Sequence, residues 1–405
     1  MHSGGDIRSY NIARHLAERH ELTFFSYYDG ARDEEYENAL RAHFPLAVCV
    51  CTGQKNDTAL RRGIDYALRL PQQAPYAVSR FASRAVETPL KRWYQERAFD
   101  VAICDFLDAA VNLPQELTIP TVLFQHNVES EIWRRHAQTE TNVVRRPLYA
   151  IEFSKMLAYE KAVVQRFPHV IAVSEHDRKL MSAWVDALKI TVVPTGVDLS
   201  QYRPEFTQLD AKPLVIFVGA MDWEPNIDAV EFFCENVWPA VLAQVPEARF
   251  RIVGRNPGAR VQRWAGDSIE VTGKVPSVVD HLREAAVVVV PLRIGGGTRL
   301  KIYEAMAAGK AVVSTSVGAE GLDVHHGRDI VLADDAKTMT DSILTLLRDG
   351  DARSKYEHAA AELAARYDWA SVSRKFEEVI EKVAAVYPPR GLETVAQEEA
   401  GDRAV

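Results

Sequence analysis

The stretch Val287–Thr315, which reads VVVVPLRIGGGTRLKIYEAMAAGKAVVST, decides the fold class of this chain. Its four consecutive valines predict a strand that is apolar on both faces, as in the centre of a covered parallel sheet. Three glycines follow, then strong helix formers up to Ala308, and then a second apolar run at 311–315. A strand, a helix and a second strand in this order predict a β-α-β unit with parallel strands.

The same alternation of short apolar runs and longer helical patterns extends over the chain and predicts an α/β protein. In the second half, strands are expected at 214–218, 250–253, 269–271, 287–291, 311–315 and 330–332, and helices at 226–244, 259–265, 278–285, 300–308 and 336–348. In the first half, strands are expected at 22–26, 47–51, 101–104, 121–124, 170–173 and 191–193, and helices at 8–19, 59–70, 79–97 and 144–166.

The length of 405 residues indicates two domains. A stretch with three prolines, from Pro194 to Pro213, contains few apolar residues and marks a boundary. The predicted organisation is an N-terminal domain at 1–198, a C-terminal domain at 199–370, a helix at 371–388 that returns to the N-terminal domain, and a disordered acidic tail at 389–405.

The N-terminus departs from the doubly wound pattern, in which a strand precedes the first glycine-bearing turn. Here Gly4 and Gly5 come at once, and no strand precedes them. Either the chain is truncated relative to its functional form, or this domain is built without its usual first central strand.

Composition excludes several classes of protein. The chain is 47% apolar and 26% charged, which is typical of a globular protein, and its net charge of −8 argues against general nucleic-acid binding. No apolar run is long enough to span a bilayer, and the N-terminus does not read as a signal peptide. The four cysteines show no metal-ligand spacing, so they are expected to be small apolar residues in a reducing cytoplasm.

Two basic segments that carry aromatic residues stand out against the net negative charge. They are Lys91–Tyr94 and Trp133–Arg135. They could dock the N-terminal domain on the anionic inner face of a membrane that carries a lipid-linked acceptor. The alternative is a solvated face whose aromatic side chains belong to the core.

The glycine loop at 295–297 is the first candidate site. Glycines allow a ligand to approach closely, and the N–H groups of Gly297, Thr298 and Arg299 would point at an anion. Arg299 and Lys301 add cations suited to phosphate, and Glu304 is able to accept hydrogen bonds from a ribose diol. The alternative is a tight turn with solvated charges.

His126 is the second candidate, because it follows the strand at 121–124 and so lies at the carboxyl end of a parallel strand. There it could hydrogen-bond a sugar hydroxyl or a phosphate, or act as an acid or base; the alternative is a locally satisfied loop histidine. The loop at Gly4 and Gly5 is a weaker candidate for a phosphate-binding turn.

Other motifs argue against rival chemistries. Asp349-Gly350-Asp351 has the DxD pattern but follows a helix, so we expect a surface turn and no metal site. Zinc-protease, serine-hydrolase and P-loop motifs are absent from the sequence. The dinucleotide pattern GxGxxG is also missing at both expected first turns, which argues against a nicotinamide dehydrogenase.

Taken in order, these motifs resemble the family 4 retaining glycosyltransferases of the GT-B fold. Besides Val287–Thr315, the resemblance rests on Phe217–Gly219 with Asp222–Asn226, and on the landmarks His2–Arg8, His126–Glu129, Val173-Ser174 and Val193–Asp198. It runs from Ser3 to about Phe376 and is nearest to sugar transferases of bacterial exopolysaccharide pathways. It implies two Rossmann-like parallel-sheet domains that face each other across a cleft.

The resemblance also implies site residues. Glu304 matches the family's ribose-binding glutamate, while the first glutamate of its pair would fall at Gly296 and is missing. The two cations that normally follow the first strand of the C-terminal domain are absent from 220–226, so we predict that Arg299 and Lys301 replace them. The expected donor-binding residues are Gly4, Gly5, Val275, Gly296, Gly297, Thr298, Arg299, Leu300, Lys301 and Glu304, and the expected catalytic residues are His126, Glu304 and Gly5.

The implied activity is metal-independent, retaining transfer of a sugar from a nucleotide-diphosphate sugar to a glycan, lipid-linked or small-molecule acceptor. No cofactor is implied apart from this donor substrate. A nucleotide-sugar epimerase would need carboxylates that face the sugar, and Gly296 argues against one. A non-catalytic scaffold or partner subunit is the other alternative, favoured by the missing strand and the missing glutamate.

Overall fold

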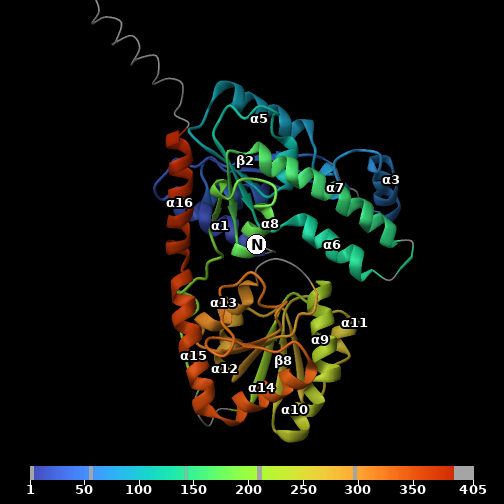
Figure 1. Cartoon of the computed structure of the whole chain (residues 1–405), viewed down its shortest axis with the longest axis vertical. Coiled ribbons are helices and arrows are strands. Elements are labelled where there is room, and N and C mark those ends of the chain that lie inside the picture. The colour runs from blue at the N-terminus through green and yellow to red at the C-terminus, as the bar shows by residue number, and fades with distance from the viewer. Residues whose placement is uncertain are drawn as a thin grey trace, which may run out of the picture. The chain divides into compact units, whose positions relative to one another are not determined.

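A computed structural model describes residues 4–53, 58–140, 142–143, 145–207, 212–294 and 299–386 (Figure 1). The chain forms two compact units: unit 1 contains residues 1–193 and 373–405, and unit 2 contains residues 194–372. The chain enters unit 2 at Pro194, shortly before the boundary expected after Asp198, and re-enters unit 1 at Ser373.

The sheet of unit 2 is parallel throughout. Its strands are β7 (Leu214–Val218), β8 (Arg249–Val253), β9 (Ile269–Gly273), β10 (Val287–Val290), β11 (Ala311–Ser314) and β12 (Val331–Leu332). They lie in the order β12-β11-β10-β7-β8-β9. The strand order therefore reverses between β7 and β10, which is where doubly wound sheets bind ligands, at the carboxyl ends of the strands.

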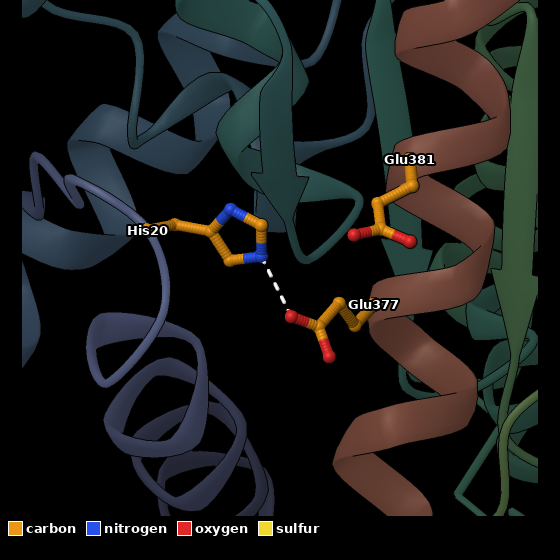
Figure 2. Close-up of side chains that lie close together, drawn as sticks. All are labelled: His20, Glu377 and Glu381. Carbon is orange, nitrogen blue, oxygen red and sulfur yellow. Dashed lines mark hydrogen bonds and ion pairs between the residues drawn. The ribbon is translucent and has the colours of Figure 1, made fainter.

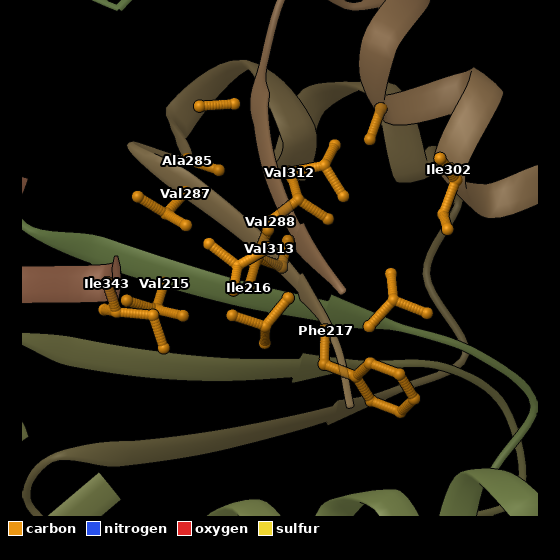
Figure 3. Close-up of a cluster of buried hydrophobic side chains, with 14 of the residues drawn as sticks. Val215, Ile216, Phe217, Ala285, Val287, Val288, Ile302, Val312, Val313 and Ile343 are labelled. Carbon is orange, nitrogen blue, oxygen red and sulfur yellow. The ribbon is translucent and has the colours of Figure 1, made fainter. Parts of the chain in front are cut away.

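The valine run predicted to be buried on both faces is β10, and all four of its residues are buried. Figure 3 shows Val287 and Val288 among side chains of the neighbouring strands, including Val215 and Val313. Full burial of each such side chain contributes about 1.5–3 kcal/mol. The helices of this unit are α9 (Glu224–Asn236), α10 (Trp238–Gln244), α11 (Ala259–Gln262), α12 (Val278–Glu284), α13 (Leu300–Ala307), α14 (Ala336–Arg348) and α15 (Gly350–Ala364).

Two helix predictions for unit 2 were wrong. The single helix expected at 226–244 is two helices, α9 and α10, that meet at Val237, because Pro239 has no N–H for a continuous helix and instead lies in the first turn of α10. No helix was expected at 350–364, where α15 lies. Its N-cap is Asp349, whose side chain accepts a hydrogen bond from the N–H of Ala352 at 2.9 Å, so the DxD pattern is a junction between helices.

Unit 1 contains two sheets. A four-stranded parallel sheet consists, in chain order, of β3 (Ala102–Asp105), β4 (Thr121–Gln125), β5 (His169–Ala172) and β6 (Ile190–Val192), while β1 (Phe25–Tyr28) and β2 (Val48–Cys51) form a separate parallel pair. In unit 2 the strand that comes first in sequence lies in the middle of the sheet. The described part of unit 1 contains no strand in that position.

The helices of unit 1 are α1 (Gly4–Ala17), α2 (Glu34–His43), α3 (Ala59–Arg69), α4 (Tyr76–Ser79), α5 (Arg84–Glu96), α6 (Glu129–Thr139), α7 (Arg145–Arg166) and α8 (Glu175–Met181), with most of α16 (Trp369–Val386). The expectation that Gly4 and Gly5 form a loop before the first helix was wrong, because both lie in the first turn of α1. Their N–H groups still belong to those that a helix leaves without intrahelical partners.

The last helix, α16, forms ion pairs with the segment that follows α1 through a buried carboxylate. Glu377 pairs with Arg19 at 2.7 Å and with Nε2 of His20 at 2.8 Å, as Figure 2 shows for the histidine. One ring nitrogen of His20 and one carboxylate oxygen each of Glu377 and Glu381 lie within 4.8 Å of one another. The apolar face of the same helix is buried, and Phe376 packs edge-on against Phe124 of β4.

Helix α6 is capped by a residue of another helix. Val128 at its N-cap provides no capping side chain. Instead the carboxylate of Glu160 in α7 accepts hydrogen bonds from the N–H of Glu129 at 2.7 Å and of Ser130 at 3.0 Å, and from the amide of Gln125 at 2.5 Å. Glu160 is fully buried, so these bonds replace all of its hydration.

The Glu160→Gln variant is expected to change how stability depends on pH. Burial raises the pKa of Glu160 to about 7, against the lowering effect of its N–H donors. The pKa of Glu160 in the folded protein therefore lies above its ordinary value of 4.5. At a pH between 4.5 and about 7, the folded protein keeps a proton on Glu160 that the unfolded chain has released. The free energy of unfolding should therefore decrease from pH 5 to pH 8, and in the variant this decrease should be smaller by up to about 3 kcal/mol.

Urea unfolding at both pH values measures the effect, with Glu116→Gln, which removes an exposed carboxylate, as the control. Glutamine at 160 can keep the bonds from Glu129 and Gln125, which share one oxygen, but it loses the bond from Ser130, because an amide accepts with only one of its two terminal atoms. An unchanged pH dependence in Glu160→Gln would contradict the prediction.

Candidate functional site

The first candidate site lies in unit 2, where β10 leads into α13. Arg299 is the N-cap of α13, and Leu300, Lys301 and Glu304 follow in the helix. Gly296, Gly297 and Thr298 lie outside the described residues, so their predicted contacts with an anion stay predictions. Gly309 follows the helix at a φ of 74°, as expected for a glycine that ends a helix.

Lys301 reaches the segment that follows β7. Its Nζ donates a hydrogen bond to Oδ1 of Asn226 at 2.9 Å and lies 4.5 Å from the centre of the Phe217 ring. A Cβ on Gly219 would come within 2.8 Å of this Nζ, so a larger residue there would displace the end of the lysine side chain. The ammonium group therefore lies against residues 217–226, the segment that lacks the two expected cations.

Burial dominates the electrostatics of Lys301. Loss of hydration, with a smaller effect of the Arg299 charge, lowers the pKa of Lys301 to about 7, and Glu304 opposes this change. An anion next to such a group is stabilising, because it replaces the hydration that the cation has lost.

Arg299 is the second cation of the site and is only 7% exposed. Its guanidinium lies over the ring of Trp223, 5.2 Å from the ring centre, which is a cation–π contact. Trp223 is the N-cap of α9. Both cations of α13 thus contact the segment between β7 and α9.

Glu304 is half-buried, and its carboxylate accepts a hydrogen bond from the hydroxyl of Tyr202. Burial raises the pKa of Glu304, while the hydrogen bond from Tyr202 and the charge of Lys301 lower it. Val275, two residues after the end of β9, is partly buried against the core of unit 2.

The positions of these residues along the sheet agree with a ligand site. Lys301, Asn226 and Val275 follow β10, β7 and β9, respectively, and these strands are parallel. The three residues are therefore connected to the same carboxyl edge of the sheet, where α/β proteins bind ligands. Arg299, Lys301 and Glu304 all belong to α13 or its N-cap, so these three side chains lie on neighbouring turns of one element.

The second candidate site lies in unit 1 around His126, the first residue after β4. Its Nε2 is 2.6 Å from Oδ1 of Asp105, the last residue of β3, and its Nδ1 is 2.7 Å from Nη1 of Arg8 in α1. His126 is 3% exposed. Its partners lie 21 and 118 residues away along the chain, so the ring is held by other elements of the fold and not by its own loop.

Aromatic rings fix the plane of the same imidazole. Phe106 stacks on His126 with ring centres 3.9 Å apart and planes 12° apart, and Phe124 lies 4.2 Å away on a tilted plane. Phe106 has a φ of 69°, in the left-handed region that non-glycine residues rarely adopt. Such backbone strain is typical of functional sites.

The sequence did not single out Asp105 or Arg8. Asp105 is a carboxylate directly at the carboxyl end of a predicted strand, which is the signal that could have identified it. Arg8 is 3% exposed, and burial lowers its pKa to about 10. Only the fold shows that α1 brings this arginine to His126.

The two basic segments have their aromatic side chains in the interior. Trp93 packs edge-on against Phe25 and Phe99, Tyr94 is buried, and Trp133 packs against the core of unit 1. Trp93 and Trp133 are half-buried and Tyr94 is buried, which agrees with the alternative of core aromatics. No helix in the described part of the chain combines the length and the apolar character needed to cross a bilayer.

Comparison with known proteins covers both units. Residues 2–201 match the family model described as Glycosyltransferase Family 4, and residues 212–349 match the one described as Glycosyl transferases group 1. A phosphatidyl-myo-inositol mannosyltransferase of Mycolicibacterium smegmatis is 27% identical over 331 residues, which are 78% of this chain and 80% of the relative. One from Mycobacterium leprae is 30% identical over 227 residues, 53% of this chain and 59% of the relative.

Solved structures resemble nearly the full length of the chain. Sucrose-phosphate synthase of Thermosynechococcus elongatus has a TM-score of 0.69 at 19% identity and covers 95% of this chain and 94% of its own. HepE of Anabaena in complex with UDP has a TM-score of 0.65 at 14% identity, over 94% of this chain and 96% of its own. At these identities the likeness concerns the fold alone.

Proposed function

We propose, from the premise that this chain is a glycosyltransferase of the GT-B fold, that it transfers a sugar from a nucleotide-diphosphate sugar with retention of the anomeric configuration. The observation that carries the proposal is the half-buried ammonium group of Lys301, which contacts the segment between β7 and α9. This segment is where the family's diphosphate-binding cations are expected, and the sequence there contains none.

The donor would be held by α13 and the segment before it. Arg299 and Lys301 would pair with the diphosphate oxygens, and Glu304 would accept hydrogen bonds from the ribose hydroxyls. Gly296, in place of the family's first glutamate, leaves the contacts of the sugar hydroxyls to backbone N–H groups. Val275 would contact the base through its backbone, as the family resemblance implies.

The proposed reaction is transfer on one face of the sugar. The bond between the anomeric carbon and the diphosphate oxygen breaks, the bond to the acceptor oxygen forms on the same face, and the departing diphosphate takes the acceptor's proton. The chain's task is to stabilise the charge on the leaving group, which Arg299 and Lys301 would do without a metal ion. We propose that His126 hydrogen-bonds the transferred sugar or its phosphate.

The acceptor class is proposed from the relatives. Two of them are named phosphatidyl-myo-inositol mannosyltransferases. We propose a hydroxyl of a glycan or of a lipid-linked glycan as the acceptor in this chain, in the assembly of a bacterial surface polysaccharide or glycolipid at the inner face of the membrane. Transfer to membrane-extracted acceptors and to soluble oligosaccharides distinguishes these cases.

Donor binding is expected to take up a proton at pH 8. With a pKa of about 7, Lys301 is mostly neutral at pH 8, and a diphosphate beside it raises that pKa, so a proton enters with the donor. At pH 6 the group is already charged, and the uptake should disappear. Calorimetric titration with UDP, GDP, ADP and dTDP sugars, in two buffers of different ionisation enthalpy, identifies the donor and counts the protons.

Lys301→Met is the control for this measurement, because it cannot take up the proton. Binding of a nucleotide sugar at pH 8 without proton uptake would contradict the proposed place of the diphosphate. The absence of binding for every nucleotide sugar tested would contradict donor binding itself.

A non-catalytic partner subunit is the second candidate function. It is favoured by Gly296, which stands where the family's first glutamate is expected. Such a subunit shows neither transfer nor donor hydrolysis, so an assay of the purified chain with its identified donor discriminates between the two candidates.

A further inference from the structure

His126 has a partner at each ring nitrogen, and the two partners are of opposite charge. The guanidinium of Arg8 is 2.7 Å from Nδ1, and the carboxylate of Asp105 is 2.6 Å from Nε2. A guanidinium can only donate hydrogen bonds, and a carboxylate can only accept them. Nδ1 must therefore present its lone pair to Arg8, and Nε2 must carry the hydrogen that Asp105 accepts.

This arrangement opposes a second proton on the ring. An imidazolium would point an N–H at the guanidinium of Arg8, so the hydrogen bond at Nδ1 would be lost and two positive charges would meet. Burial, with a smaller effect of Arg8, lowers the pKa of His126, while Asp105 and Asp6 raise it. The charged groups that act on the imidazole are thus Asp105 on β3 and Arg8 and Asp6 on α1, and Asp177 of α8 acts on Arg8.

The ring cannot escape these partners by turning. It is stacked on Phe106 and packed against Phe124, and its side chain is only 2% exposed. Asp105 is more accessible, with 33% of its side chain exposed. A substrate oxygen can therefore approach His126 from the Nε2 side. There it can accept a hydrogen bond from Nε2 together with Asp105, or in place of Asp105.

We propose that Arg8 and Asp105 are positioning residues that hold His126 as a neutral imidazole with its hydrogen on Nε2, so that it donates a hydrogen bond to the substrate and does not accept a proton. The role toward substrate rests on the proposed function, whereas the state of the ring does not. A histidine of this kind hydrogen-bonds an electron-rich oxygen, which in a glycosyl donor is a sugar hydroxyl or a phosphate oxygen. It cannot serve as the base that deprotonates the acceptor, which agrees with a proton that leaves with the diphosphate.

Nuclear magnetic resonance of protein labelled with ¹⁵N-histidine tests the state of the ring in the full chain without substrate, with the His126 signal assigned by comparison with His126→Gln. From pH 8 to pH 6, His126 should keep an unprotonated Nδ1 and a protonated Nε2. Arg8→Met removes the donor and the positive charge, so an imidazolium should become detectable by pH 6. Arg8→Lys should restore the neutral form, and Asp105→Asn should keep it, because its amide oxygen accepts from Nε2.

Arg14→Met is the matched control, since it makes the same change at an exposed position of the same helix. It should leave the His126 signals unchanged. If wild-type His126 is protonated at Nδ1, or charged at pH 7, or if Arg8→Met titrates like the wild type, the inference is wrong. The thermal transition of each variant shows that it is folded.

Once the donor is known, the pH dependence of kcat and KM tests the role of His126 toward substrate. In Arg8→Met, kcat should fall about 10-fold from pH 8 to pH 6 with little change in KM, whereas the wild type should lack this ionisation and Arg8→Lys should recover its profile. Equal profiles for Arg8→Met and the wild type would overturn the role toward substrate. If no transfer is found, the proposed function fails and the resonance data still decide the state of the ring.

Discussion

Replacement of Arg299 and Lys301 together by alanine should remove detectable donor binding and lower transfer by about 10²- to 10⁴-fold. Each cation would make a charge-assisted hydrogen bond to the diphosphate, worth about 1.5–3 kcal/mol, so the loss of two gives about 3–6 kcal/mol. No other cation is expected to compensate, since the sequence from Ala220 to Asn226 contains none. Calorimetry with the identified nucleotide sugar measures the loss.

The control is Arg293→Ala, in the segment just before the glycine loop. Arg293 is about half exposed and pairs with Asp228, so its removal takes away one exposed positive charge without touching α13. It should leave donor affinity within about 3-fold of the wild type, since exposed ion pairs contribute little. Retained donor binding in the double variant, with a normal unfolding transition, would show that the diphosphate lies elsewhere.

Glu304→Gln should weaken donor binding by about 10- to 100-fold. The carboxylate is proposed to accept two hydrogen bonds from the ribose diol, and an amide can accept with only one of its two terminal atoms. A hydrogen bond to a charged group is worth about 1.5–3 kcal/mol, which sets the size of the effect. Titration with the ribonucleotide and with its 2′,3′-dideoxy form measures how much of this energy depends on the ribose hydroxyls.

A double-mutant cycle makes this test specific. If Glu304 binds the diol, the dideoxy nucleotide should bind wild type and Glu304→Gln with similar affinity, because the interacting hydroxyls are gone. Tyr202→Phe removes the hydroxyl that supports Glu304 and should have a smaller effect, below about 10-fold. Equal losses for both nucleotides in Glu304→Gln would assign the residue a structural role instead.

Much of the fold could be predicted from local sequence because its strands are apolar on both faces. The valines of β10 and the run from Leu214 to Val218 in β7 have no other stable environment than a covered sheet. The predicted GT-B fold is confirmed by the parallel sheets of both units and by the likeness to sucrose-phosphate synthase.

Helix α15 shows why part of the fold was missed. Its buried face contains Arg353 and Glu357, whose side chains are 3% and 0% exposed and lie 3.8 Å apart. Charged residues at buried positions break the apolar periodicity by which an amphipathic helix is recognised. The pairing that makes their burial tolerable is visible only in three dimensions.

The two candidate sites also differ in how far the sequence could predict them. Arg299, Lys301 and Glu304 lie within one and a half helical turns, so their proximity could be read from the sequence. The contacts of His126 join three elements that are far apart in the chain, and so does the cap that Glu160 provides for α6. These contacts depend on the order of strands and the packing of helices, which no local pattern encodes.

The return of α16 to unit 1 has a consequence for synthesis on the ribosome. Unit 2 is one continuous stretch, residues 194–372, and can complete its core as soon as that stretch has emerged. Unit 1 is made first but lacks Phe376 and Glu377, the partners of Phe124 and Arg19, until nearly the whole chain has been translated. The unit that starts first is therefore the one that finishes last, and its apolar surface under α16 needs protection from aggregation for the entire interval.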